Sequence, residues 1–238
     1  IQFVDITTPT ITCPPAITID LDANCNYNDD PSLTGEPVIS DNCTIPTATY
    51  SDDDSGLIGN CSNTGTINRT WTVTDECGNF STCLQKITVQ DIIDPTITCP
   101  TDVTIDVDAN CNYDISPNFT GNPTIDDNCT GASASYVDNT SGLTLCSGTG
   151  VVIRTWTVTD DCNNSSSTSA RFTIEDTEPP VVVCKDITIQ LDTDGNAIIT
   201  ATDIDNGTSD VCCDVSNLDY DVDISTFNVG NVGNTTVT

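Results

Sequence analysis

The chain repeats itself, and the length of the repeat limits what it can fold into. Asp5 to Gln90 runs DITTPTITCPPAITIDLDANCNY…SDNCT…NRTWTVTDECGN…KITVQ, and Asp91 to Glu175 runs DIIDPTITCPTDVTIDVDANCNY…DDNCT…IRTWTVTDDCNN…RFTIE. A looser copy, DTEPPVVVCKDITIQLDTDGNA, begins at Asp176 and reaches Thr238 without an RTWTVTD segment. A period of 85 to 86 residues, counted between Asp5, Asp91 and Asp176, is too long for a solenoid and suits a small autonomous domain. We therefore predict a first repeat at 5–90, a second at 91–175 and an incomplete third at 176–238, with residues 1–4 as the tail of a preceding domain.

Within a repeat, apolar and polar residues alternate with a period of two. Ile17, Ile19 and Leu21 share one face of a predicted strand, and Trp71 and Val73 share one face of another. Strands with one buried and one wet face are typical of antiparallel sheets. No segment shows a sustained helical period, and the LDTDGNA segment at 191–197 predicts a tight hairpin turn. The pattern predicts an all-β chain of tandem immunoglobulin-like β-sandwich domains, elongated as a string.

Each complete repeat has one tryptophan, and each tryptophan follows an arginine by two positions. Trp71 follows Arg69, and Trp156 follows Arg154. A ligand-binding aromatic residue is one interpretation. We favour a core position for both tryptophans, with the arginines along the margin of the sheet.

The charge excludes whole classes of partner. The chain has 36 acidic and 5 basic residues, a formal net charge of −31. Nucleic-acid binding needs a basic face, and an anionic membrane would repel this chain. Because such a charge makes the compact state repel itself, bound divalent cations are expected, with a merely solvated acidic surface as the alternative.

The cysteines indicate an oxidising compartment. Fourteen cysteines with no histidine are typical of secreted, disulfide-stapled domains and not of structural zinc sites. Comparison of the copies favours bridges inside each repeat: Cys13–Cys43, Cys25–Cys61, Cys77–Cys83, Cys99–Cys129, Cys111–Cys146 and Cys184–Cys213 (or Cys212). Thr168 stands where Cys83 has its counterpart, so this scheme leaves Cys162 single, as a buried thiol or as a link to another chain. A competing scheme, Cys13–Cys83 with Cys43–Cys77, would leave Cys99 without a partner.

The set TCP…ITIDLDANC…SDNC…RTWTVTDECGN…TC resembles the hyalin-repeat (HYR-like) domains that occur in tandem in very large surface and secreted proteins of Bacteroidetes. The resemblance covers nearly the whole chain. It implies an immunoglobulin-like sandwich, a role in adhesion or extracellular stalks, including filamentous adhesins used in gliding motility, and no catalytic residues. Thr168 and Asn228-Val229 depart from the pattern, since a cysteine is expected at both places.

The segments between repeats are the best candidates for a metal site. VQDIIDP and IEDTEPP place paired carboxylates just before proline. Calcium binds six to eight hard oxygen ligands, so both neighbouring repeats would have to contribute. The candidate ligands are Asp91, Asp94, Asp176, Glu178, Asp22, Asp108, Asp127 and Asp210, and the alternative is a solvated acidic hinge.

These features predict a structural protein and not an enzyme. There is no histidine, nucleophile elbow or phosphate-binding loop. We expect a stalk or filament segment of a large extracellular, cell-surface adhesin, contacting neighbouring domains of the same long chain and other copies in a fibre. The alternative is an accessory glycan- or protein-binding module of a secreted enzyme, for which the exposed aromatics would be Tyr27, Tyr50, Tyr113, Tyr136 and Tyr220.

Overall fold

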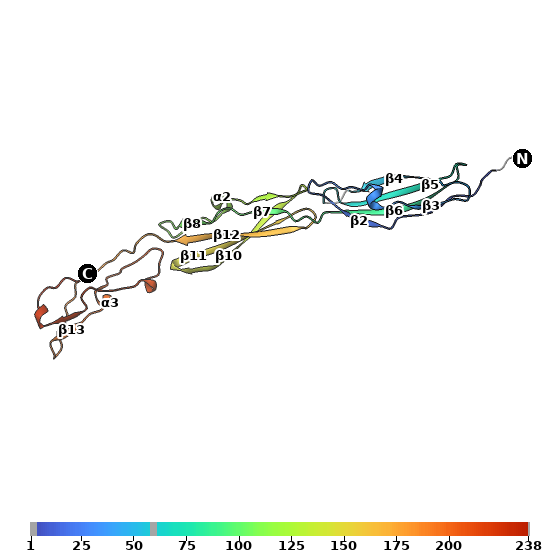
Figure 1. Ribbon diagram of the computed structural model, residues 1–238. Coiled ribbons are helices and arrows are strands. Elements are labelled where there is room, and N and C mark those ends of the chain that lie inside the picture. Colours follow the sequence, from blue (N-terminus) through green and yellow to red (C-terminus); the bar gives the residue numbers. More distant parts are fainter. Residues whose placement is uncertain (1–3, 58–60, 238) are drawn as a thin grey trace. The chain divides into compact units, whose positions relative to one another are not determined.

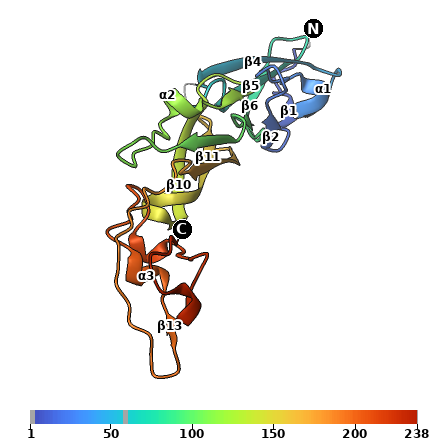
Figure 2. The ribbon, with the colours of Figure 1, turned by 90° about the vertical axis from the view of Figure 1, so that its left-hand side faces the viewer.

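The protein is described by a computed structural model that covers residues 4–57 and 61–237, so most of the predicted tail at 1–4 lies outside the described residues (Figures 1 and 2). The chain is nearly all-β, which confirms the predicted fold class. It divides into two compact units. The first contains the chain up to Cys99 with Pro123–Tyr136 and Trp156–Thr168, and the second contains Pro100–Asn122, Val137–Thr155 and Ser169–Thr238. Each unit takes residues from successive repeats, and the repeat boundaries stay predictions.

The first repeat has a sandwich-like arrangement of a small and a large sheet (Figure 1). The small sheet pairs β1 (Thr10–Thr12) with β3 (Val38–Ser40), and the large sheet has the order β2 (Ile17–Asp20), β6 (Phe80–Gln90), β5 (Gly65–Thr74), β4 (Thr47–Gly56). A single helical turn, α1 (Pro31–Thr34), lies between β2 and β3 in the chain.

The second repeat has the same elements in the same order. Its small sheet pairs β7 (Thr96–Thr98) with β9 (Thr124–Asp126). Its large sheet has the order β10 (Ser133–Leu145), β11 (Thr149–Thr159), β12 (Ser165–Glu175), β8 (Val103–Asp106). Its short helices are α2 (Pro117–Thr120) and a 3₁₀ turn at Cys146–Gly148. The third repeat has one two-stranded sheet, of β13 (Asn196–Ile198) and β14 (Thr226–Asn228), with α3 (Ala201–Ile204) and 3₁₀ turns at Val215–Asn217 and Val229–Asn231.

The expectation of purely antiparallel sheets is wrong at one strand of each large sheet. β2 runs parallel to β6, with Ile17 opposite Ile87, and β8 runs parallel to β12 in the same way. Pro14 and Pro15 interrupt the chain between β1 and β2. Because proline cannot donate to a ladder, pairing with β3 stops there and the next residues pair with the large sheet.

The core follows the predicted alternation. Leu21 is buried with Ile67, Ile87 and Val89, and the partly buried Ile17 and Ile19 pack against them. Both tryptophans are buried, as predicted, and Trp71 donates from Nε1 to Gln85 Oε1 at 3.1 Å. The side chains of Tyr50 and Trp71 pack together, with ring centroids 5.2 Å apart.

The arginines beside the tryptophans lie in the core and not on the sheet margin, which corrects the sequence prediction. Arg69 is 0% exposed, and its Nε and Nη2 donate to the two carboxylate oxygens of Asp52, each at 2.8 Å. Its Nη1 donates to Thr34 Oγ1 at 2.8 Å, which holds α1 on the sheet. Arg154 makes the same contacts with Asp138 and Thr120. Burial is tolerated because each guanidinium finds a carboxylate that matches its planar fork.

Candidate functional site

All six predicted disulfides are wrong. The structure pairs Cys13–Cys83, Cys25–Cys129, Cys61–Cys162, Cys111–Cys212 and Cys146–Cys213, and the thiols of Cys43, Cys77, Cys99 and Cys184 are free. The prediction assumed that each repeat is closed on itself. Cys25 and Cys61 lie instead where the first repeat meets the second, so their partners belong to the next copy. Cys162, predicted to be single, is bonded.

Cys25 lies in a turn whose shape is set by Asp22. The Asp22 carboxylate accepts hydrogen bonds from the backbone N–H groups of Asn24 and Asn26, at 2.8 and 2.9 Å. These bonds lower the pKa of Asp22, and the bond from Asn26 has the larger effect. Cys25 itself has φ +62°, in the left-handed region. The sulfur of Cys25 therefore lies at the tip of a turn that these hydrogen bonds hold.

The same turn occurs in all three repeats. Asp108 accepts from Asn110 and Asn112, Cys111 has φ +63°, and Cys111 is bonded to Cys212. In the third repeat Asp192 forms the predicted turn, and Gly195, with φ +78°, replaces the cysteine. Glycine is the residue that this backbone conformation favours. A cysteine in a glycine position, within LDANC and VDANC, is thus the sequence signal for a bridge to the next repeat.

Beside the bridges Cys25–Cys129 and Cys61–Cys162 lies a cluster of three carboxylates. Oxygens of Asp91, Asp127 and Asp160 all lie within 4.8 Å of one another, and Asp91 and Asp160 are only 7% and 6% exposed. Burial, and to a lesser extent the charges of Asp160 and Asp91, raise the pKa of Asp127. Three carboxylates held this close repel one another unless a proton or a cation joins them.

Two oxygens at the cluster lack hydrogen-bond partners. Asp127 Oδ1 and Asn128 Oδ1 are buried without a donor. Asn128 Nδ2 lies 3.3 Å from the Asp22 carbonyl oxygen and 3.3 Å from each Asp91 carboxylate oxygen, so the cluster reaches the Cys25 turn. Hard, uncompensated oxygens from several segments fit a calcium ion. The sulfurs of Cys61 and Cys162 are close to Asp91 but are bonded to each other, so they are not thiolate ligands.

The predicted metal ligands divide into two groups. The structure brings Asp91 and Asp127 together, and it places Asp176 near Asp210 beside the bonded Cys213. Asp22 and Asp108 accept the hydrogen bonds of the turns described above, and among the described residues neither belongs to such an acidic group, so their role as ligands stays a prediction. Among the described residues no such acidic group includes Asp94 or Glu178. Asp160 was not predicted, although its TDDC segment repeats TDEC at 74–77.

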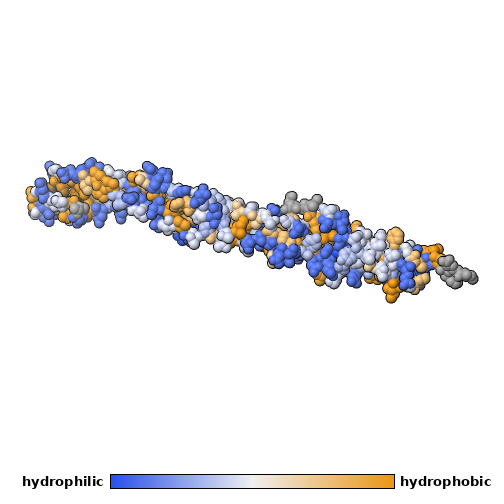
Figure 3. Space-filling view, turned by 90° about the horizontal axis from the view of Figure 1, so that it is seen from above, coloured by the Kyte–Doolittle hydropathy of each residue, from blue (hydrophilic) through white to orange (hydrophobic). Residues whose placement is uncertain are grey.

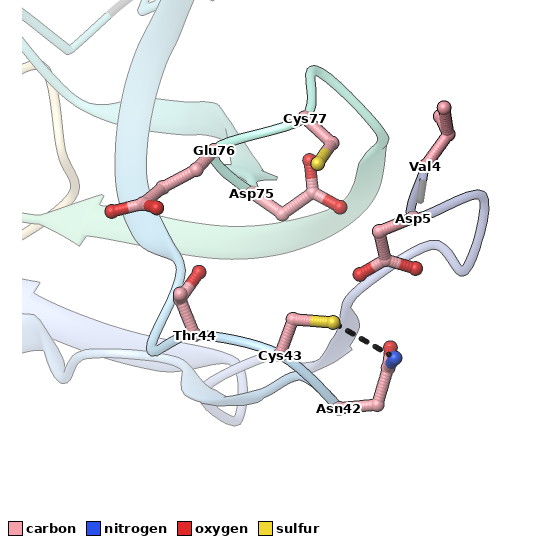
Figure 4. Close-up of a pocket in the computed structure, with 8 residues that line it drawn as sticks. All are labelled: Val4, Asp5, Asn42, Cys43, Thr44, Asp75, Glu76 and Cys77. Carbon is pink, nitrogen blue, oxygen red and sulfur yellow. Dashed lines mark hydrogen bonds between the residues drawn. The ribbon is translucent and has the colours of Figure 1, made fainter. Parts of the chain in front are cut away.

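The first repeat carries the counterpart of this cluster at its own end, which we call the N-terminal pole (Figure 4). A cavity of about 370 Å³ is lined there by Val4, Asp5, Asn42, Cys43, Thr44, Asp75, Glu76 and Cys77. Asp41 Oδ1 is buried there without a hydrogen-bond partner. A hydrogen bond to Asp5 raises the pKa of the Cys43 thiol to about 11, so this thiol is protonated at neutral pH.

Two of the five tyrosines named above pack on the buried tryptophans. Tyr50 and Tyr136 pack on Trp71 and Trp156. On the face seen in Figure 3, hydrophobic residues are interspersed with hydrophilic ones. None of the helices in the described part of the chain has the length and apolar character needed to cross a membrane.

The geometry defines a class of protein: an all-β chain whose successive repeats are joined by pairs of disulfides, as forms in an oxidising compartment. No protein-family profile and no curated protein matches the chain. Among solved structures it is similar to Drosophila N-cadherin EC1-4, at 13% identity and a TM-score of 0.35, over 71% of this chain and 50% of that one. It is also similar to human CDH23 EC21-23, at 12% identity and a TM-score of 0.33, over 76% and 73%. The chain thus spans about half of the N-cadherin structure, and likeness at this level carries no argument about function.

Proposed function

We propose that this chain is a structural segment of a large extracellular adhesin or filament, an HYR-like array in which each repeat is fixed to the next by two disulfides. The supporting observation is that four of the five disulfides among the described residues join successive repeats. One bridge inside a domain stabilises that domain. Two bridges across a joint prevent its two sides from rotating and separating, which a load-bearing spacer needs. The chain has no catalytic role in this proposal, and its partners are neighbouring repeats.

The test is to pull the oxidised and the reduced chain by their ends. In the oxidised chain the shortest covalent path runs to Cys25, crosses to Cys129, follows the chain to Cys146, and crosses to Cys213. That path has about 66 residues, so full extension should stop at roughly 230 Å, against roughly 830 Å after reduction, at about 3.5 Å per residue. Single-molecule force extension measures both lengths.

The matched control is the Cys25→Ser, Cys111→Ser variant, which keeps one bridge at each joint. Its extension should still stop far short of the reduced length, through Cys61–Cys162 and Cys146–Cys213. Equal lengths for the oxidised and reduced wild-type chains would contradict the proposal.

We further propose that Asp91, Asp127 and Asp160 hold calcium at the first joint, with Asn128 Oδ1 as an additional ligand. The cation would neutralise the repulsion of the three carboxylates and stiffen the joint next to its bridges. The support is the unpartnered Asp127 and Asn128 oxygens together with the burial of Asp91 and Asp160.

Calcium should raise the melting temperature of the oxidised chain. If Kd is about 0.1–1 mM, as in extracellular calcium modules, 10 mM calcium stabilises by roughly 1.4–2.7 kcal/mol. The pKa of Asp127 is raised, so the folded state holds a proton more firmly than the unfolded state does. Without calcium, the contribution of Asp127 to stability should therefore rise as the pH falls through that raised pKa towards the ordinary value of 3.8, and added calcium should reverse this contribution.

The Asp127→Asn variant distinguishes calcium binding at the carboxylate cluster from general screening of the chain's negative charge. It should raise the melting temperature in a chelator, because one repelling charge is removed, and abolish the calcium shift. Asp126→Asn, at an exposed position next to it on β9, should leave both unchanged. A calcium shift that survives Asp127→Asn would show that the ion binds elsewhere.

A further inference from the structure

Two exposed thiols lie together at the N-terminal pole. Cys43 follows β3, Cys77 lies in the β5–β6 turn, and both line the cavity of Figure 4. An exposed free thiol is unusual in a protein of an oxidising compartment. Two of them in one cavity need an explanation that the fold of the first repeat does not supply.

The second repeat shows what cysteines at these positions do. Cys43 in SDNC matches Cys129 in DDNC, and Cys77 in TDEC matches Cys162 in TDDC. Cys129 and Cys162 are not bonded to each other. They bond to Cys25 and Cys61 of the repeat that precedes them.

The hydrogen bonds around these cysteines also match between the first and the second repeat. Asn79 Nδ2 donates to Asp75 Oδ2 at 2.7 Å and to the Asp5 carbonyl oxygen at 3.1 Å. Asn164 Nδ2 makes the same bonds to Asp160, at 2.8 Å, and to Asp91, at 3.2 Å. The backbone N–H groups of Cys43 and Cys129 both donate, at 3.1 Å, to the aspartate two positions earlier. The N-terminal pole therefore already has the shape of an assembled joint.

One contact differs, and it points to the missing occupant. In the joint, Asn128 Nδ2 reaches the carbonyl of Asp22 in the preceding repeat. Asn128 Nδ2 and the matching Asn42 Nδ2 both lie against the following cysteine Sγ, at 3.4 and 3.3 Å (Figure 4), so the contact with a carbonyl of another repeat is what Asn42 lacks. The group that Asn128 contacts belongs to a Cys25-type turn, and residues 4–57 and 61–237 place no such turn at the N-terminal pole.

We infer that the N-terminal pole is a docking surface for a further copy of the repeat, whose Cys25-type and Cys61-type cysteines bond to Cys43 and Cys77. Each bond joins two thiols with loss of two protons and two electrons, which a disulfide oxidant such as oxidised glutathione accepts as it becomes two thiols. The other free thiols have a different origin. Cys99 matches Cys13, but Thr168 stands where Cys83 would bridge it. This inference rests on the proposed role as one link of an array.

The test supplies the missing copy. A copy of residues 5–90 is joined directly to Asp5 of the chain, in place of residues 1–4, which reproduces the native junction between Gln90 and Asp91. The copy's own Cys43 and Cys77 are changed to serine, and Ala23→Ser and Ser62→Thr mark its peptides by mass. The protein is refolded with reduced and oxidised glutathione, digested without reduction and mapped by mass spectrometry.

We expect marked peptides that join the copy's Cys25 to Cys43 and the copy's Cys61 to Cys77, with both thiols protected from alkylation. A Cys43–Cys77 bond, or two thiols that stay alkylatable, would overturn the inference. Cys13–Cys83 reports folding of the first repeat in the same digest. If Cys25–Cys129 and Cys61–Cys162 form but the new bonds do not, this inference alone fails, whereas absence of all four bonds contradicts the proposed function. A Cys43→Ser variant should lose one new bond and keep the other.

Discussion

Thr168→Cys is expected to create a new disulfide with Cys99 and to stabilise the second repeat. In the first repeat Cys13 is bonded to Cys83 across the two sheets, with a sequence separation of 70 and Cα atoms 5.8 Å apart. Cys99 and Thr168 occupy the matching positions, and each is half-buried like its counterpart. A bridge that closes a loop of this length stabilises by about 2–4 kcal/mol, chiefly by restricting the unfolded chain.

The measurements are a count of free thiols and thermal unfolding of the oxidised protein. Thr168→Cys should remove one titratable thiol from the folded chain and raise the melting temperature of the transition that includes the second repeat. Thr168→Ser is the matched control, because it changes the same side chain without supplying a sulfur. If Cys99 stays alkylatable in the oxidised Thr168→Cys protein, the two repeats do not share this geometry.

Arg69→Ala should destabilise the first repeat by about 2–3 kcal/mol, because it removes a buried side chain whose hydrogen bonds run to charged partners. The guanidinium is fully buried and donates to Asp52, to Thr34 and, at 3.2 Å, to Asp29. The substitution leaves the partly exposed carboxylates of Asp52 and Asp29 without their cation, and it also releases α1. Arg69→Lys should recover part of the loss, because it restores the charge but not the two-pronged bond to Asp52.

Equilibrium denaturation of the oxidised chain measures this loss. Lys86→Ala is the control, since it removes an exposed cation from the neighbouring strand and should change stability little. The double variant with Asp52→Ala should lose less than the sum of the two single variants, because the second change removes a charge that the first left unpaired. Additive losses would mean that Arg69 and Asp52 do not act as a pair.

The strands were predictable because they depend on local chemistry. Alternation at 17–21 and 71–73 specifies which faces must be buried, whatever the rest of the chain does. The burial of Leu21 and Trp71 agrees with this reading. Parallel pairing of β2 with β6 was not predictable in this way, because alternation specifies a face and not a neighbour.

The buried arginine shows a different limit. Arg69 occupies an inward position of β5, in phase with Trp71 and Val73, yet we predicted that it lies along the margin of the sheet. The charge of the side chain argued for the margin instead. Asp52, on the next strand, decides the outcome, because it lies directly opposite Arg69 in the register of β4 and β5.

The sequence by itself determined that this protein is a set of small, acidic, all-β repeats with cysteines at equivalent positions. Tertiary structure alone decided how those cysteines pair. A disulfide usually has Cα atoms about 4.4–6.8 Å apart, and this distance does not depend on how far apart the two cysteines lie in the sequence. Cys25 and Cys129 meet it at 5.0 Å with a sequence separation of 104. Comparison of the repeats marks Cys25 as a candidate for a bridge to the next repeat but does not show which cysteine it meets. The repeat predicts where the thiols are, and only the folding of one repeat against the next determines which of them meet.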